Sequence, residues 1–215
     1  MPDLGTYLTF IAAALAMQLT PGPDMALVVG RGVGQGRQVA IWTAIGTTAG
    51  AGAIQIPLVT FGVASLIETW PLLFTVIRVL GAAYLIWLGV LLLWRAGSHA
   101  AAMPRRGTPT ALAAFRDGMV SNLTNPKPLM FMLAFLPQFV EPAHGSVTTQ
   151  LLILSATQKL TGTLVMVSCA LVSGSLGSWL SRHPRVIAWQ QRFTAVVLIG
   201  LGARLLLAGD PRAVR

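Results

Sequence analysis

The chain has 215 residues, of which 54% are hydrophobic and only 10% are charged, and its formal net charge at pH 7 is +9. Soluble domains carry about 25% charged residues, so this composition excludes a soluble domain and favours insertion into a lipid bilayer. A basic balance can indicate nucleic-acid binding. Here the arginines are spread between apolar runs, so we expect no nucleic-acid partner. The single cysteine, Cys169, excludes an intramolecular disulfide.

Six apolar runs, taken in chain order, predict six transmembrane helices, because a membrane-spanning helix needs about 20 apolar residues. The runs cover residues 4–30, 39–67, 72–94, 118–140, 147–180 and 193–209. The polar segment 95–116 lies between the third and fourth runs and is predicted to be a loop, not a separate domain. Residues 1–215 are therefore predicted to form one membrane domain, with one half at about 1–95 and the other at about 117–215.

Arginines are distributed unevenly among the predicted loops. The loops after the first, third and fifth spans carry all of the following: Arg31, Arg37, Arg95, Arg105, Arg106, Arg116, Arg182, Arg185 and Arg192. The two short turns on the other side carry none. Cytoplasmic loops are enriched in Lys and Arg, so the pattern predicts that both termini are periplasmic. Only Arg204, Arg212 and Arg215 would then lie against the rule.

Two proline-rich segments interrupt the first and fourth predicted spans. Residues 19–24 read Leu-Thr-Pro-Gly-Pro-Asp, and residues 123–128 read Leu-Thr-Asn-Pro-Lys-Pro. Proline removes a backbone donor and clashes with the preceding helical turn. The backbone groups that it frees are tolerated at membrane depth only inside protein or beside a wet cavity. Matching broken helices in two halves indicate a transporter's binding site. Because each half has three spans, the repeat is predicted to be inverted, with both breaks facing one cavity.

Three charged residues lie deep within the apolar runs: Asp24, Lys127 and Lys159. Charges at this depth are costly and usually face a wet interior or a partner. Asp24 could carry a proton or bind a substrate ammonium group, or it could cap the helix that follows the break. Lys127 could bind a substrate carboxylate, form an ion pair between the breaks, or extend toward the cytoplasm. Lys159 is predicted to pair with Asp24 or with a substrate carboxylate.

Gln18, Asn122 and Asn125 are the uncharged polar residues beside the breaks. They could satisfy freed backbone groups or contact a substrate, and the sequence leaves both roles open. The three histidines, His99, His144 and His183, all fall in predicted loops. We therefore expect neither a metal site nor a cofactor.

No Walker phosphate-binding loop is present, so the proton gradient is a better predicted driving force than ATP. An intramembrane enzyme is one alternative, and it would rest on Ser155 and Lys159 acting as a Ser–Lys pair. A membrane scaffold or assembly subunit is another alternative, but such a protein would not need paired helix breaks.

Four segments resemble the lysine-exporter/homoserine-resistance (LysE/RhtB) family: residues 18–24, 81–89, 115–128 and 131–140. They occur in the family's order, and the resemblance covers essentially the whole chain. It implies a bacterial inner-membrane exporter of amino acids or related metabolites. The family's signature positions fall on Pro21, Gly22, Pro23, Asn125, Pro126 and Lys127.

The predicted protein is thus an all-α integral membrane protein of six helices, built as two inverted three-helix repeats whose first and fourth helices are broken. It is predicted to be a secondary transporter and not an enzyme, and its partners are an amino-acid substrate, protons and the lipid bilayer. Neutral substrates are favoured over dibasic ones, because Lys127 and Lys159 outnumber Asp24 in the apolar interior. A homodimer is one assembly open to such a chain.

Overall fold

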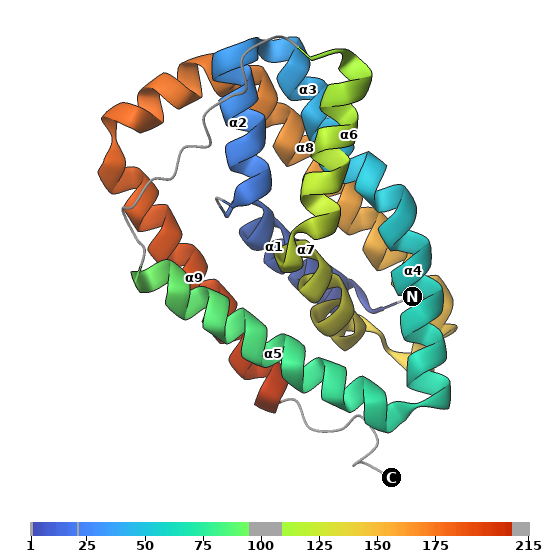
Figure 1. The fold of residues 1–215 in the computed structure, drawn as a ribbon. Coiled ribbons are helices and arrows are strands. Elements are labelled where there is room, and N and C mark those ends of the chain that lie inside the picture. Colours follow the sequence, from blue (N-terminus) through green and yellow to red (C-terminus); the bar gives the residue numbers. More distant parts are fainter. Residues whose placement is uncertain (1, 21, 95–108, 208–215) are drawn as a thin grey trace.

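The computed structural model describes residues 2–20, 22–94 and 109–207, and within these ranges the fold is entirely helical (Figure 1). The first half contains α1 (Leu4–Gln18), α2 (Pro23–Gln35), α3 (Arg37–Ile45), the π-helical turn η1 (Gly46–Gly50), α4 (Ala51–Thr69) and α5 (Pro71–Trp94). The second half contains α6 (Ala111–Thr124), α7 (Pro126–Met130), the π-helical turn η2 (Phe131–Phe135), the 3₁₀ turns η3 (Leu136–Phe139) and η4 (Pro142–His144), α8 (Val147–Arg182) and α9 (Pro184–Leu207). The predicted all-α class is confirmed.

The predicted spans correspond to these helices, with differences at three points. The first span is two helices, α1 and α2, whose axes are bent by 54°. The fourth begins at Ala111 instead of 118, because the Thr110 hydroxyl oxygen caps α6 by accepting from the Ala113 N–H at 3.2 Å. The sixth begins at Pro184 instead of 193, and proline is well suited to a first helical position.

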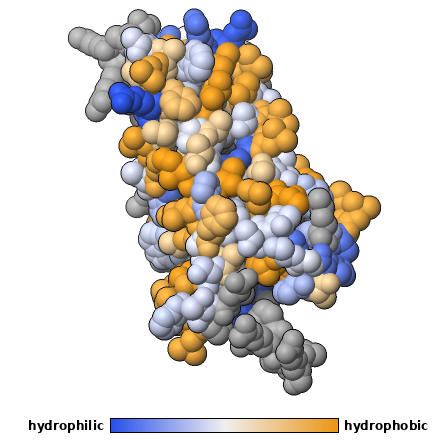
Figure 2. All heavy atoms as spheres, turned by 90° about the vertical axis from the view of Figure 1, so that its right-hand side faces the viewer, coloured by the Kyte–Doolittle hydropathy of each residue, from blue (hydrophilic) through white to orange (hydrophobic). Residues whose placement is uncertain are grey.

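Within the described part of the chain, three helical stretches are long and apolar enough to cross a membrane: Arg37–Leu66, Thr75–Trp94 and Val147–Gly174. The bent pair of α1 and α2 also passes when it is taken as one span. Figure 2 shows apolar side chains over much of the middle of one face, with hydrophilic groups gathered near its upper end. The integral-membrane class is confirmed, and the full set of six spans stays a prediction.

An aromatic cluster fills the core between α1 and the irregular helix that follows α7. Phe131, Phe135 and Phe139 are buried in succession along η2 and η3, with ring centroids 4.7 and 4.9 Å apart. Phe10 of α1 joins them at 5.3 Å from Phe139. The second break is thus followed by a segment that packs tightly against the helix preceding the first break.

The packing of α3 and η1 against α6 is close enough to require glycine. A methyl group on Gly46 would lie 2.0 Å from the Phe115 carbonyl oxygen, and one on Gly118 would lie 2.2 Å from the Thr43 carbonyl oxygen. Both distances are far below van der Waals contact. The first half and the second half therefore meet through their backbones directly beside the second break.

The helices α5 and α9 lie side by side at the edge of the molecule and make the same contact twice (Figure 1). A methyl group on Gly89 would lie 2.8 Å from the Ala195 carbonyl oxygen, and a methyl group on Gly202 would lie 2.8 Å from the Ala82 carbonyl oxygen. Each glycine also faces an isoleucine of the other helix, Ile199 for Gly89 and Ile86 for Gly202. The contact is reciprocal. A two-fold axis relating α5, the last helix of the first half, to α9, the last helix of the second half, would produce such a contact.

Candidate substrate site between the two helix breaks

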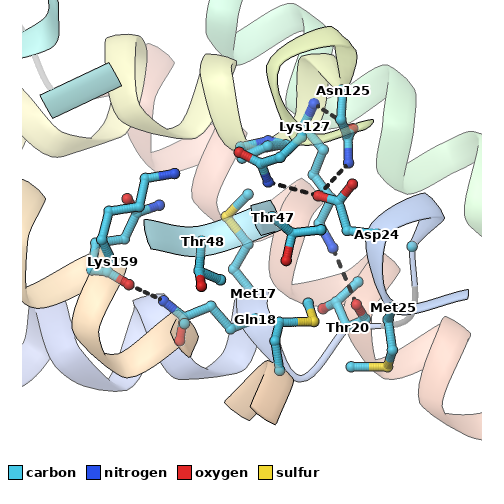
Figure 3. Close-up of a pocket in the computed structure, with 16 residues that line it drawn as sticks. Met17, Gln18, Thr20, Asp24, Met25, Thr47, Thr48, Asn125, Lys127 and Lys159 are labelled. Atoms are coloured by element: carbon cyan, nitrogen blue, oxygen red, sulfur yellow. Dashed lines mark hydrogen bonds between the residues drawn. The ribbon is translucent and has the colours of Figure 1, made fainter. Parts of the chain in front are cut away.

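A cavity of about 70 Å³ lies where the two breaks meet. It is lined by residues of both halves: Met17, Gln18, Thr20, Gly22, Asp24, Met25, Thr47 and Thr48 from the first, and Asn122, Asn125, Lys127, Pro128, Gln158, Lys159, Gly162 and Met166 from the second. In Figure 3, Asp24, Asn125 and Lys127 gather on one side of this cavity, and Lys159 lies on the other, beyond Thr47 and Thr48.

Asp24 stands in the first turn of α2 and is only 6% exposed. Its Oδ1 accepts from the Ser121 hydroxyl at 2.7 Å, and its Oδ2 accepts from the side-chain amides of Asn122 at 2.7 Å and Asn125 at 3.1 Å. All three donors are uncharged and belong to α6 or the residue after it. The carboxylate therefore connects the first break to the second.

Asp24 does not cap α2, as the alternative interpretation from the sequence had it. The N-cap of α2 is Gly22, which has an extended backbone and no side chain to offer, and Pro23 occupies the first helical position. Pro23 needs no partner there, because it has no N–H. Pro21, the other proline of this break, lies outside the described residues.

Asn125 organises the second break through both ends of its side-chain amide. Its Oδ1 accepts from the Lys127 backbone N–H at 3.1 Å and so caps the short helix α7, which starts at Pro126. Its Nδ2 donates to Asp24. Both groups of the amide are thereby used, so Asn125 has a structural role in this arrangement, and Pro126 initiates the helix without lining the cavity.

The ammonium group of Lys127 crosses from the second break to the first. Its Nζ donates to the Thr20 carbonyl at 3.3 Å, and a methyl group on Gly22 would lie 3.6 Å from it. Thr20 immediately precedes the proline of the first break, where a carbonyl is freed from regular helical bonding. Lys127 thus faces the cavity instead of extending toward the cytoplasm, and the small residue at position 22 leaves it room.

Lys159 is 8% exposed, and its ammonium group donates to the Gln55 side-chain oxygen on α4. Its aliphatic stem passes close to Gly52, where an added methyl group would lie 3.2 Å from the lysine Cγ. Lys159 was predicted to pair with Asp24 or with a substrate carboxylate. In the structure its hydrogen bond goes to Gln55, and Lys159 and Asp24 lie on opposite sides of the cavity (Figure 3).

Gln18, at the end of α1, connects that helix to α8. Its Nε2 donates to the Gln158 backbone carbonyl at 2.8 Å and to the Thr161 hydroxyl at 3.1 Å. Gln18 and Asn122 both line the cavity, as predicted for polar residues beside the breaks.

Sequence reasoning missed five polar residues of this region: Thr47, Thr48, Gln55, Ser121 and Gln158. Ser121 could have been found, because residues 121, 122 and 125 lie on one face of a helix by their spacing. Gln55 and Gln158 are single uncharged residues within long apolar runs. Nothing in the sequence marks them, and only the fold reveals that they point inward.

A second polar contact joins α2 and α6 away from the cavity. The Arg31 guanidinium donates to the Asp117 carboxylate at 2.5 Å, and Arg31 is 8% exposed. Arg31 lies two helical turns after Asp24, and Asp117 lies one turn before Ser121. Polar side chains therefore connect α2 and α6 at two places, at Asp24 beside the cavity and at Arg31 two turns further along α2.

Comparison with known proteins supports the resemblance to the lysine-exporter family over nearly the full chain. The family model described as LysE type translocator matches residues 15–209. A leucine efflux protein of Enterobacter sp. (strain 638) is 29% identical over 93% of this chain and 94% of its own. A leucine efflux protein of Klebsiella pneumoniae is 30% identical over 93% of each chain. An uncharacterized membrane protein of Pseudomonas aeruginosa is 30% identical over 97% of this chain and 99% of its own.

No solved structure matches the chain. The family match extends from α1 to the end of α9 and includes both breaks, so it confirms the resemblance on which the transporter prediction rested and replaces the enzyme and scaffold alternatives. On these grounds the chain belongs to the LysE type translocators, and it is a membrane transport protein.

Proposed function

We propose that this protein exports neutral amino acids, with leucine as the first candidate, from the cytoplasm across the bacterial inner membrane, and that protons drive the export. Two of the relatives described above carry the name leucine efflux protein. The observation that carries the proposal is a single cavity, formed by both breaks, that contains one buried carboxylate and two ammonium groups. Such a site holds groups for a substrate carboxylate and for a proton.

Lys127 is the proposed contact for the substrate carboxylate. A lysine ammonium has three N–H donors, and the Thr20 carbonyl takes one of them. Lys127 lines the cavity, so its remaining donors are available to a substrate there. Since Lys127 and Lys159 both face this cavity, a substrate with a second ammonium group would be repelled, which favours neutral amino acids over dibasic ones.

Asp24 is the proposed proton carrier. Its three partners are uncharged, so protonation would break no direct ion pair. It would, however, convert charge-assisted hydrogen bonds into weaker neutral ones and turn one acceptor oxygen into a donor. The contact between α2 and α6 would then weaken. Because both helices contribute residues to the cavity, the charge of Asp24 would control how tightly the cavity walls are held together.

The proposed architecture is two inverted repeats of three spans each, with both termini in the periplasm. The reciprocal glycine contacts of α5 and α9 support the two-fold relation, and the arginine distribution supports the orientation. One chain supplies both helix breaks, so a single copy is the proposed transport unit. A homodimer would be an assembly of two complete units.

Reconstitution into proteoliposomes tests the proposal through two variants. Asp24→Asn should abolish the accumulation of L-leucine that an imposed pH gradient drives, but should leave exchange of preloaded L-leucine. Lys127→Ala should weaken the apparent affinity in both assays by about 10- to 100-fold, because it removes a hydrogen bond from a charged donor. Asp3→Asn, which changes an exposed carboxylate outside the cavity, serves as the control.

A failure of this proposal has a clear signature. An Asp24→Asn protein that still concentrates L-leucine under a pH gradient would remove the coupling role and leave Asp24 as a structural connection. A wild-type protein that exchanges neither leucine nor any other neutral amino acid would overturn the proposed substrate class.

A further inference from the structure

Three residues that line the cavity have a side-chain amide oxygen that is buried and has no hydrogen-bond partner among the described residues: Gln18 (Oε1), Asn122 (Oδ1) and Gln158 (Oε1). Asn122 and Gln158 are each only 6% exposed. Buried polar atoms are nearly always paired, so three orphaned acceptors in one cavity require an explanation beyond packing.

The orientations of two of these amides are fixed by their nitrogen atoms. Asn122 Nδ2 donates to a carboxylate oxygen of Asp24, and Gln18 Nε2 donates to a backbone carbonyl. Neither of those partners can donate in return while the carboxylate is ionised, so the amides cannot be flipped. Their oxygens are therefore the ends left without a partner, and an oxygen of this kind can only accept.

The ligand of such a subsite must supply hydrogen-bond donors. A primary ammonium group carries three N–H donors and no lone pair, which matches three amide oxygens. The carboxylate of Asp24 is a weaker candidate for this contact, because its two oxygens already accept three hydrogen bonds. Thr47 and Thr48 also line the cavity, and both donate their hydroxyl hydrogens to the Ala44 carbonyl, which leaves only acceptor capacity facing inward.

We propose that Gln18, Asn122 and Gln158 form an uncharged subsite that binds the α-ammonium group of the substrate through their side-chain oxygens. This inference rests on the proposed export of neutral amino acids and adds the part of the site that recognises the amine. The substrate amine is held by neutral acceptors, Lys127 holds the substrate carboxylate, and Asp24 stays available for the proton. Substrate and proton then occupy different groups of one cavity, as coupled transport requires.

A competition experiment can show whether the site recognises the substrate's amine or binds the substrate through its carboxylate alone. In counterflow of labelled L-leucine into proteoliposomes, unlabelled L-leucine and 2-hydroxy-4-methylpentanoate compete as a matched pair. The second compound has the same carbon skeleton and carboxylate but offers one O–H in place of three N–H donors. We expect it to compete about 100-fold more weakly or worse, since two hydrogen bonds from a charged donor are lost.

Substitution of Gln158 by methionine (Gln158→Met) assigns the effect to this subsite. It should weaken competition by L-leucine about tenfold or more and change competition by 2-hydroxy-4-methylpentanoate by less than about twofold, because that compound forms fewer bonds there. Gln18→Met should act in the same direction. Gln150→Met is the matched control, since Gln150 is also a buried glutamine of α8 but is bound to the Glu141 and Gly145 carbonyls outside the cavity.

Three outcomes would overturn the inference. Equal competition by the two compounds in the wild-type protein would show that the amine is not recognised, whether or not the variants fold. An equal loss for both compounds in Gln158→Met, with the control unaffected, would show that Gln158 only supports the cavity. Absence of exchange for leucine and every other neutral amino acid in the wild type would overturn the proposed function itself, and the subsite with it.

Discussion

At the scale of single residues, the contact between α2 and α6 depends on two buried charges whose surroundings differ. Asp24 is held by three neutral donors. Arg31 faces one carboxylate, that of Asp117, whose side chain is 48% exposed. A second guanidinium nitrogen of Arg31 has no partner among the described residues. Removing Asp117 would therefore leave a nearly buried cation with nothing opposite it, which costs more than the pair contributes.

Asp117→Ala should destabilise the protein by about 1–3 kcal/mol. The double variant Arg31→Met/Asp117→Ala should regain much of this loss, because it removes the uncompensated charge together with its partner. Thermal unfolding midpoints in detergent measure both. Equal midpoints for the single and double variants would show that the buried charge carries no penalty, and the pair would then count as a solvated surface contact.

Charge was the property that made residues predictable at this scale. Asp24, Lys127 and Lys159 stand out because an ion within an apolar run is expensive, and all three line the cavity. Of the two predicted partners of Lys159, Asp24 does not accept its hydrogen bond, because Gln55 does, and a substrate carboxylate stays a prediction. An uncharged glutamine costs little to bury when it is paired, so a single sequence gives no reason to single it out.

At the scale of helices, the second break is positioned by backbone contacts that leave no room for a side chain. Gly46 and Gly118 bring α3 with η1 and α6 together beside the cavity. In η1, Thr47 and Thr48 both donate to the Ala44 carbonyl at 2.8 and 2.9 Å. Side-chain bonds of this kind compete with the helical ladder and accompany local distortions, so the irregular turn places both threonines toward the cavity.

Gly118→Ala should lower the free energy of unfolding by about 1–3 kcal/mol through overpacking and reduce leucine exchange, because α6 carries Ser121 and Asn122. Gly174→Ala is the matched control: it lies in α8, and an added methyl group there meets nothing within 4 Å. Unfolding midpoints and exchange rates of the two variants can be compared directly. Unchanged behaviour of Gly118→Ala would mean that the helices can separate without cost.

The helix boundaries show what the sequence could and could not supply at this scale. The proline segments correctly predicted where the first and fourth helices are interrupted, because proline acts locally. The early start of α6 was also readable, since Thr110 is a standard capping residue. The reciprocal contact of α5 and α9 was not, because glycines within an apolar run do not reveal which helix they face.

At the scale of the whole molecule, the predicted orientation assigns each end of the bundle to one side of the membrane. The junction of α2 with α3, the start of α6 and the end of α8 lie toward one end, at the top of Figure 1. Arg31, Arg37 and Arg116 belong to the first two of these segments. Helices from distant parts of the chain thus bring their arginines to a common end, as a cytoplasmic face requires.

Reporter fusions after Arg105 and Arg185 should read cytoplasmic, and fusions after Glu68 and His144 should read periplasmic. A paired phosphatase and fluorescent-protein fusion at each site measures the location directly. A cytoplasmic reading at His144 would rule out the six-span arrangement, and with it the inverted repeat.

The bonds between the two breaks also have a consequence in time. Asp24 and its partner Asn125 are 101 residues apart in sequence, and Thr20 and Lys127 are 107 apart. A ribosome adds about 5–20 residues per second, so the first break is synthesised about 5–20 s before any of the groups that satisfy it. During this interval the carboxylate of Asp24 lacks the three partners that it has in the folded protein, and it gains them only when Ser121, Asn122 and Asn125 have been made.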